Sequence, residues 1–173
     1  MSSPRLLHGP LYRFSDRSTS TVPLGRAGMY TIWRGSEFIY VGMGGRGIAG
    51  TDEKMKDGLR GRLKQHESGD RSGDKFCVYV FDRLLLCDLT RQQIEDAASG
   101  KISLDHEVRA FVHKYLSYRY ILTTDRPDGT AAGRVAEALE KQIQHEELGG
   151  QLPLLNPART RPPATDVRHS SVR

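Results

Sequence analysis

Two short apolar runs separated by a polar turn stand out in the first third of the chain. Residues Met29 to Trp33 and Phe38 to Val41 are mostly apolar, whereas residues 34–37 between them are polar and include a glycine. Short apolar runs on either side of such a linker are typical of a β-hairpin. The pattern therefore predicts an antiparallel hairpin over residues 29–41.

Strand-like and helix-like patterns follow the hairpin. Residues 42–50 are too rich in glycine for a regular element. The β-branched and aromatic residues between Lys75 and Arg83 predict a third strand. Residues 117–124 form either a fourth strand or the end of the preceding helix. Helices are predicted over residues 54–66, 90–98 (with Thr90 as N-cap), 103–116 and 131–148, the last stopped by Gly149 and Gly150.

These elements predict one α+β domain with a small, mostly antiparallel sheet of three strands, or four, flanked by helices. Both ends of the chain carry Ser, Thr, Arg and Pro without periodicity. We therefore expect a flexible N-terminal arm over residues 1–25, a domain over residues 26–158 and a disordered basic tail over residues 159–173.

The composition indicates which class of binding partner to expect. The chain has 173 residues, a formal net charge of +5 and a pI near 9.4, which favours an anionic partner, with nucleic acid first. Cys77 and Cys87 lack metal-ligand spacing, so a reducing compartment fits best. A long apolar run and a cleavable leader are both missing from the sequence, which predicts no membrane association and a cytoplasmic protein, associated with the nucleoid if it binds DNA.

The hairpin and the helix after it bring together residues that are candidates for a functional site. Neighbouring strands lie about 4.8 Å apart, so Tyr30 and Tyr40 can share a site. Arg62 and His66 lie one helical turn apart, on one flank of the buried stripe formed by leucines of the same helix. For Arg62 alone, a surface ion pair is the alternative interpretation. Arg60 and Lys64 point more outward, where a charged face has an ordinary explanation as solvation; they are also candidate nucleic-acid contacts.

The last helix contains two acids that periodicity separates. Glu140 borders the buried face, whereas Glu137 lies nearly opposite it and is expected to face water. A carboxylate at the edge of the core is a candidate ligand for Mg²⁺ or Mn²⁺, since Mg²⁺ is commonly held by one carboxylate, waters and a substrate phosphate. The alternative is an amphipathic helix whose edge residue happens to be Glu.

Two loop residues complete the set of candidates. Arg46 lies in the glycine-rich loop, whose exposed N–H groups can bind an anion; the alternative is a mobile loop with a solvated Arg. Asn156 is a polar residue in an apolar segment, and it either caps backbone groups or maintains the geometry of a site.

Together these residues resemble the GIY-YIG endonuclease family. Gly28-Met29-Tyr30 matches the first box with Met in place of Ile, and Tyr40-Val41-Gly42 matches the second with Val in place of Ile. Three further segments are similar to the family's first-helix Arg and His, its metal-binding Glu helix and its terminal Asn segment: Arg62 to His66, Ala138 to Glu140, and Leu155 to Pro157. The resemblance covers about residues 26–158 and makes residues 84–130 an insertion.

The resemblance implies metal-dependent hydrolysis of phosphodiester bonds in DNA. The implied roles are Tyr30 as general base, Tyr40 positioning water or a phosphate oxygen, Arg62 stabilising phosphate charge, Glu140 holding Mg²⁺ or Mn²⁺, and Asn156 holding the geometry. Whether Tyr30 or His66 is the base stays open at this point.

Two other functions stay in view. One is a non-cleaving nucleic-acid-binding module that keeps the nuclease fold, and the other is a small domain that binds a protein partner through residues 84–130. The sequence leaves open the DNA target, the strand preference and the oligomeric state, a dimer included.

Overall fold

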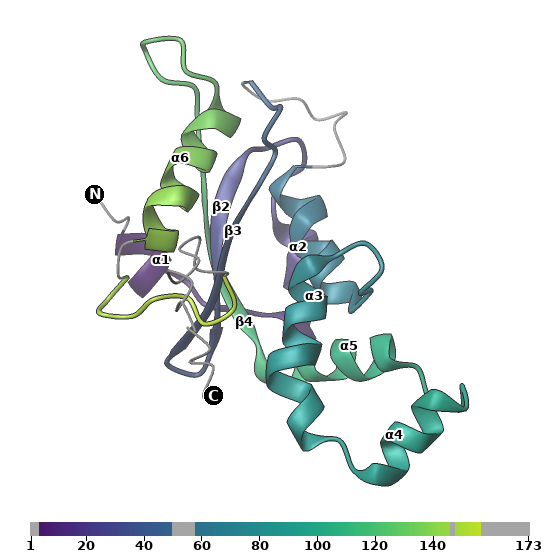
Figure 1. Cartoon of the computed structure of the whole chain (residues 1–173). Helices are drawn as coiled ribbons and strands as arrows, with labels where there is room; N and C mark the ends of the chain where they lie inside the picture. The colour runs from purple at the N-terminus through teal and green to yellow at the C-terminus, as the bar shows by residue number, and fades with distance from the viewer. Residues whose placement is uncertain (1–3, 50–57, 146–147, 157–173) are drawn as a thin grey trace, which may run out of the picture.

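Four strands form one antiparallel sheet in the computed structural model, which describes residues 4–49, 58–145 and 148–156. In spatial order the strands are β1 (Tyr12–Arg13), β4 (Ser117–Leu122), β2 (Gly28–Arg34) and β3 (Glu37–Gly44). The predicted α+β class, with a small antiparallel sheet flanked by helices, is confirmed (Figure 1).

The predicted hairpin is the pair β2 and β3. Arg34 pairs with Glu37, and Gly35 in the turn has a φ of 61°, a value that glycine adopts without steric cost. The register shifts between Ile32 and Trp33, as in a β-bulge. Every residue of β2 from Gly28 to Trp33 is buried, because helices cover both faces of the sheet.

Helices form a layer on each side of the sheet (Figure 1). One layer contains α1 (Pro4–His8) and α6 (Ala132–His145), which cover a core that includes Met29, Trp33 and Val41. The opposite layer contains α2 (Leu59–Ser68), α3 (Lys75–Val80) and α5 (Leu104–Tyr115). The main core, with Tyr30, Ile32 and Ile39, lies on this second side.

Shorter helical segments lie between these elements along the chain. They are the 3₁₀ turns η1 (Phe14–Asp16), η2 (Ser18–Thr21) and η4 (Leu86–Asp88), and the π-helical segment η3 (Phe81–Leu85). Helix α4 (Arg91–Ala98) buries none of its residues and projects away from the sheet (Figure 1). Its predicted N-cap is confirmed, since the Thr90 hydroxyl accepts from the Gln93 N–H at 3.2 Å and Gln93 accepts from the Thr90 N–H at 2.9 Å.

The predicted third strand over residues 75–83 is wrong, because these residues form α3 and the start of the π-helical segment. Asp74 caps α3 by accepting the N–H of Phe76 at 3.1 Å. Phe76, Val80 and Leu84 are buried at a spacing of four residues, which places them on one helical face. Burial of that face overrides the β-propensity of the individual residues.

Of the residues 117–124, predicted as a strand or a helix end, Ser117–Leu122 form strand β4. Leu116 has extended backbone angles and ends α5, so the chain turns directly into β4. Strand β4 lies between β1 and β2, inside the sheet. Residues 84–130, predicted as an insertion, therefore supply an inner strand in addition to α4 and α5.

The prediction of a flexible arm is wrong for residues 4–25. Leu6, Phe14 and Val22 are fully buried, and β1 pairs with β4. These residues are stabilised by contacts with parts of the chain far away in sequence, which a local pattern does not reveal.

The other predicted helices are found, with shifted ends. Residues 54–57 of the predicted first helix, residues 146–147 of the last helix and the predicted basic tail lie outside the described residues. The helix predicted over residues 103–116 is α5. Across the described part of the chain, no helix combines the length and the apolar character needed to cross a membrane.

Candidate functional site

The two hairpin tyrosines lie together on the face of the sheet that α2 covers. Their ring centroids are 6.3 Å apart. Tyr40 pairs with Ile32 across the ladder and Tyr30 pairs with Gly42, so the phenols are diagonal neighbours. Tyr30 is fully buried and Tyr40 is partly exposed. The expectation that the hairpin brings these phenols close together is confirmed.

Gly42 is a glycine because the Tyr30 ring lies over it. A Cβ added to Gly42 would stand 2.2 Å from the Tyr30 hydroxyl oxygen and 2.9 Å from a ring carbon of Tyr40. Side chains do not tolerate such approaches. The two sequence boxes are therefore physically coupled, because the tyrosine of the first occupies the space that the glycine of the second leaves free.

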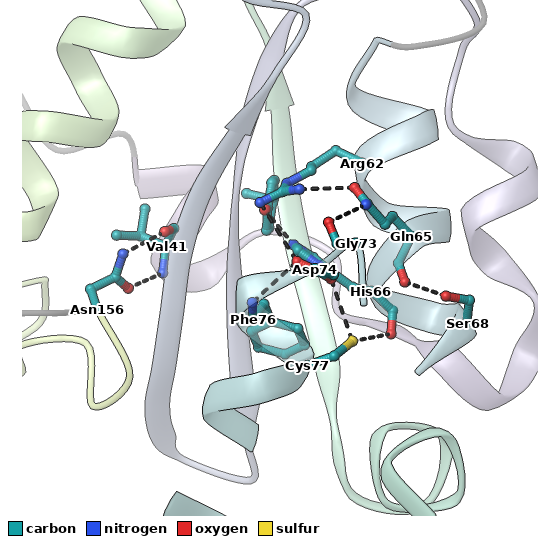
Figure 2. A network of polar contacts seen from close by, with 11 residues as sticks. Val41, Arg62, Gln65, His66, Ser68, Gly73, Asp74, Phe76, Cys77 and Asn156 are labelled. Atoms are coloured by element: carbon teal, nitrogen blue, oxygen red, sulfur yellow. Dashed lines mark hydrogen bonds and ion pairs between the residues drawn. The ribbon is translucent and has the colours of Figure 1, made fainter. Parts of the chain in front are cut away.

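His66 connects Tyr30 to an acid that the sequence analysis did not single out. The Nε2 atom of His66 lies 2.5 Å from the Tyr30 hydroxyl, and its Nδ1 atom is hydrogen-bonded to the carboxylate of Asp74. Tyr30, His66 and Asp74 are all buried. Figure 2 shows His66 and Asp74 close together between α2 and the start of α3.

Asp74 has several partners. Its Oδ1 atom accepts the N–H of Phe76 and lies 3.7 Å from the Arg62 guanidinium, while the Cys77 thiol lies 3.4 Å from Oδ2 (Figure 2). An Asp just before a helix is a recognisable N-cap. The signal was present in the sequence, but the assignment of residues 75–83 as a strand hid it.

The partners of His66 define its protonation. Burial lowers the pKa of His66, although the hydrogen bond and the charge of Asp74 oppose this shift. Burial acts to raise the pKa of Asp74, but hydrogen bonding and charge from His66, together with the charge of Arg62, lower it overall. A carboxylate only accepts hydrogen bonds, so a neutral His66 carries its proton on Nδ1 and accepts the Tyr30 hydroxyl proton at Nε2.

Both phenols are protonated at neutral pH. Burial raises the pKa of Tyr30 well above its ordinary value, and burial raises the pKa of Tyr40 to about 12. The charge of Arg62 acts in the opposite direction on both, without cancelling the effect of burial. Neither tyrosine is therefore a preformed phenolate base.

Arg62 points toward this group rather than away from the protein. Its guanidinium donates to Gln65 at 2.8 Å and lies beside the buried Asp74, with 32% of its side chain exposed. The alternative of an ordinary surface ion pair is therefore incorrect, because the carboxylate partner is fully buried. Arg62 also lines a hollow of about 450 Å³ together with Gly44, Gly45 and Arg46.

Glu140 reaches the same region from α6, on the other side of β3. Its side chain is partly buried, as predicted for a residue at the edge of the core. Burial raises the pKa of Glu140, while the charges of Arg46 and Arg62 and a hydrogen bond from the main chain of Met43 act to lower it. The carboxylate thus lies within the electrostatic reach of both arginines.

Glu137 is mostly covered, whereas the prediction was that it faces water. Only 12% of its side chain is exposed, and it binds Arg134 at 2.9 Å and Lys141 at 3.1 Å. Its carboxylate also lies 3.7 Å from Arg46. Three cations cover a carboxylate that helical periodicity alone places in water. Arg46 consequently lies near both acids at the rim of the hollow.

Asn156 braces the outer edge of β3. Its side chain accepts the N–H of Val41 at 2.8 Å and donates to the Val41 carbonyl at 2.9 Å, as Figure 2 shows. The N–H groups of Leu154 and Leu155 donate to Phe38 and Ile39 in the same segment. Of the two predicted roles, pairing with backbone groups is the one observed.

Arg60 and Lys64 are not brought to the phenols. They lie on the flank of α2 opposite Arg62, where they line two other hollows. Within the described ranges, no cluster of three or more His, Cys, Asp or Glu residues is arranged to hold a metal ion.

Comparisons of the chain with protein-family models, with curated proteins and with solved structures gave no match.

Proposed function

We propose that this protein is an endonuclease that hydrolyses phosphodiester bonds in DNA with the help of Mg²⁺ or Mn²⁺. The observation that carries the proposal is the connected series Asp74, His66 and Tyr30, which ends beside Arg62 and Tyr40. Arg62 and Tyr40 both interact electrostatically with Glu140. Buried titratable groups that act on one another beside a hollow are typical of catalytic sites.

Glu140 is the residue proposed to hold the metal. Its partly buried carboxylate accepts a hydrogen bond from the main chain of Met43, which lines the hollow of about 450 Å³. One carboxylate fits Mg²⁺, which usually keeps several waters and binds substrate phosphate instead of a full protein cage. Burial raises the pKa of Glu140, and a bound cation would act in the opposite direction and favour its ionised, ligating form. The bound metal would neutralise charge on the scissile phosphate and polarise it.

Tyr30 and His66 are proposed to act as one proton relay. The Tyr30 oxygen takes a proton from the attacking water while the phenol passes its own proton to Nε2 of His66. Asp74 then stabilises the resulting imidazolium through Nδ1. The relay avoids a free phenolate, which the raised pKa of Tyr30 makes costly. In this proposal the terminal base is His66, and Tyr30 is the group that touches water.

The remaining residues orient the substrate. Arg62 and Tyr40 are the partly exposed members of the group, so a phosphate approaches from their side. Arg62 would donate to phosphate oxygens as charge develops on them, and Tyr40 would position the water or a non-bridging oxygen. Asn156 would act indirectly, by holding the strand that carries Tyr40 in place.

Nicking of supercoiled plasmid with Mg²⁺ tests the proposal. The wild type is expected to nick, and Glu140→Ala is expected to lose nicking. The control Glu95→Gln alters an exposed carboxylate on α4 and should keep full activity. A wild type that does not nick, or a Glu140→Ala protein that nicks equally well, contradicts the proposal.

One observation favours the second candidate, a nucleic-acid-binding module without cleavage. Tyr30 and His66 are both fully buried, so neither is exposed to an attacking water in this structure. This candidate predicts a wild type that binds DNA in a salt-sensitive manner and never nicks it.

A further inference from the structure

A second group of cations lies on the flank of α2 that faces away from Arg62. We call it the basic tract, and it consists of Arg17, Arg26, Arg60, Lys64 and Arg109. Arg26 and Arg60 line one hollow of about 430 Å³, and the other three cations line a second hollow of about 430 Å³. Ser20 lines both hollows, so the two are neighbours.

Among the described residues, the cations of the basic tract are not ion-paired. Within the described part of the chain, none of its five cations forms an ion pair, whereas Arg46, Arg62 and Arg71 each have a carboxylate partner. Glu67 is the acid that lines the second hollow, and it accepts a hydrogen bond from the Thr19 hydroxyl. With five cations and this one carboxylate lining the two hollows, the tract has a net positive charge.

Two donors in the tract are already desolvated. The Nε atoms of Arg26 and Arg60 are buried and have no hydrogen-bond partner among the described residues. Buried polar groups are nearly always paired, so each unpaired one calls for an explanation. Both arginines line the same hollow, where the remaining N–H groups of their guanidiniums could donate charge-assisted hydrogen bonds to an anion.

We infer that the basic tract binds backbone phosphates of the nucleic acid whose cleavage is proposed above, and this inference rests on that proposed function. Arg60 and Lys64 are one turn apart, about 6 Å along α2, and each borders its own hollow. A lone phosphate fills one hollow, whereas a strand with successive phosphates uses both.

The tract and the candidate active site lie on opposite flanks of one helix. An α-helix is roughly 10 Å thick with its side chains. A nucleic acid that crosses α2 can therefore contact Arg62 on one flank and the tract on the other. The tract then determines how the strand lies when its scissile phosphate meets the hollow beside Arg62.

Salt-dependent binding to a defined duplex, measured without divalent metal, tests the inference. The double variant Arg26→Gln/Arg60→Gln is compared with Arg91→Gln/Lys101→Gln, which removes the same charge from exposed, ion-paired positions near α4. Each lost phosphate contact lowers the slope of log affinity against log salt by about one, so the tract variant should lose about two and the control much less. The charge-conserving variant Arg26→Lys/Arg60→Lys should keep most of the slope.

Equal slopes for the tract variant and the control overturn the inference. Titration with inorganic phosphate distinguishes a backbone phosphate from a free phosphorylated molecule. If the tract variant loses phosphate binding but keeps the wild-type salt slope on DNA, the hollow binds a free phosphorylated molecule. That result also overturns the inference. Plasmid nicking is read separately. If the wild type nicks but the tract variant keeps the wild-type salt slope, only the tract inference is contradicted. If the tract variant changes the salt slope but the wild type does not nick, only the proposed endonuclease function is contradicted.

Discussion

The Tyr30 hydroxyl lies 2.5 Å from Nε2 of His66, and this contact joins the first sequence box to the helix that follows the hairpin. Tyr30→Phe removes the hydroxyl and leaves Nε2 buried without its partner. We expect plasmid nicking to fall by roughly 10²–10⁴-fold, the usual contribution of a positioned proton-transfer group. We also expect a loss of about 1–3 kcal/mol in the free energy of unfolding. Tyr115→Phe, at an exposed position, is the control and should change neither quantity.

Asp74→Asn tests the other end of the relay. The neutral amide removes the charge that favours a protonated His66, so the pKa of His66 should fall further, as followed by NMR titration of the ring. Nicking should fall too, because an amide does not hold the tautomer with the proton on Nδ1 in the way a carboxylate does. An unchanged His66 titration would show that Asp74 does not act on the ring.

Stability should decrease with acid because of His66. The pKa of His66 is lowered in the folded protein, so below the unfolded value of about 6.5 the unfolded chain binds more protons than the folded one. The free energy of unfolding, measured by urea denaturation, should therefore fall as the pH drops from 7 to 5. His66→Gln should flatten this dependence, whereas His106→Gln, at an exposed position, should leave it unchanged.

Gly42→Ala should be strongly destabilising. The added methyl group would lie 2.2 Å from the Tyr30 hydroxyl oxygen, inside a packed layer, and overpacking of this kind costs about 1–3 kcal/mol. Gly47→Ala is the matched control, because nothing lies within 4 Å of a Cβ at that position. In thermal unfolding, the melting temperature of Gly42→Ala should be clearly lower than that of Gly47→Ala. Equal melting temperatures would contradict the close approach of Tyr30 to Gly42.

Asn156→Ala should loosen the edge of β3. The variant loses both hydrogen bonds to Val41, which are worth about 1 kcal/mol each. The Val41 amide should exchange its hydrogen faster, whereas the Tyr30 amide inside the sheet should be far less affected. Protection at Val41 that stays at the wild-type level would exclude the bracing role.

Local patterns predicted the residues whose surroundings are set by near neighbours in the chain. The hairpin followed from a polar turn between two apolar runs, and it brought Tyr30 close to Tyr40. Helical spacing placed Arg62 and His66 on the flank that faces the sheet. These predictions are confirmed because strand alternation and helical periodicity are properties of the backbone that act over a few residues.

The same reasoning was wrong where distant contacts compete with local preference. Residues 75–83 have strand-like composition, yet they form a helix that buries Phe76 and Val80 against the core. This error concealed Asp74, whose link to His66 depends on the cap of that helix. Residues 4–25 look irregular, yet they bury Leu6 and Phe14 in the two cores.

The sequence by itself therefore determined the hairpin, the two phenols, and the cation and imidazole that face them. Only the tertiary structure decided that Asp74 orients His66, that Asn156 completes the edge of β3, and that Arg26 joins Arg60 around one hollow. The physical reason is the sequence distance over which each effect acts. Periodicity, which acts over a few residues, indicates the direction in which a side chain points. The partner of that side chain depends on burial and pairing between segments far apart in the chain.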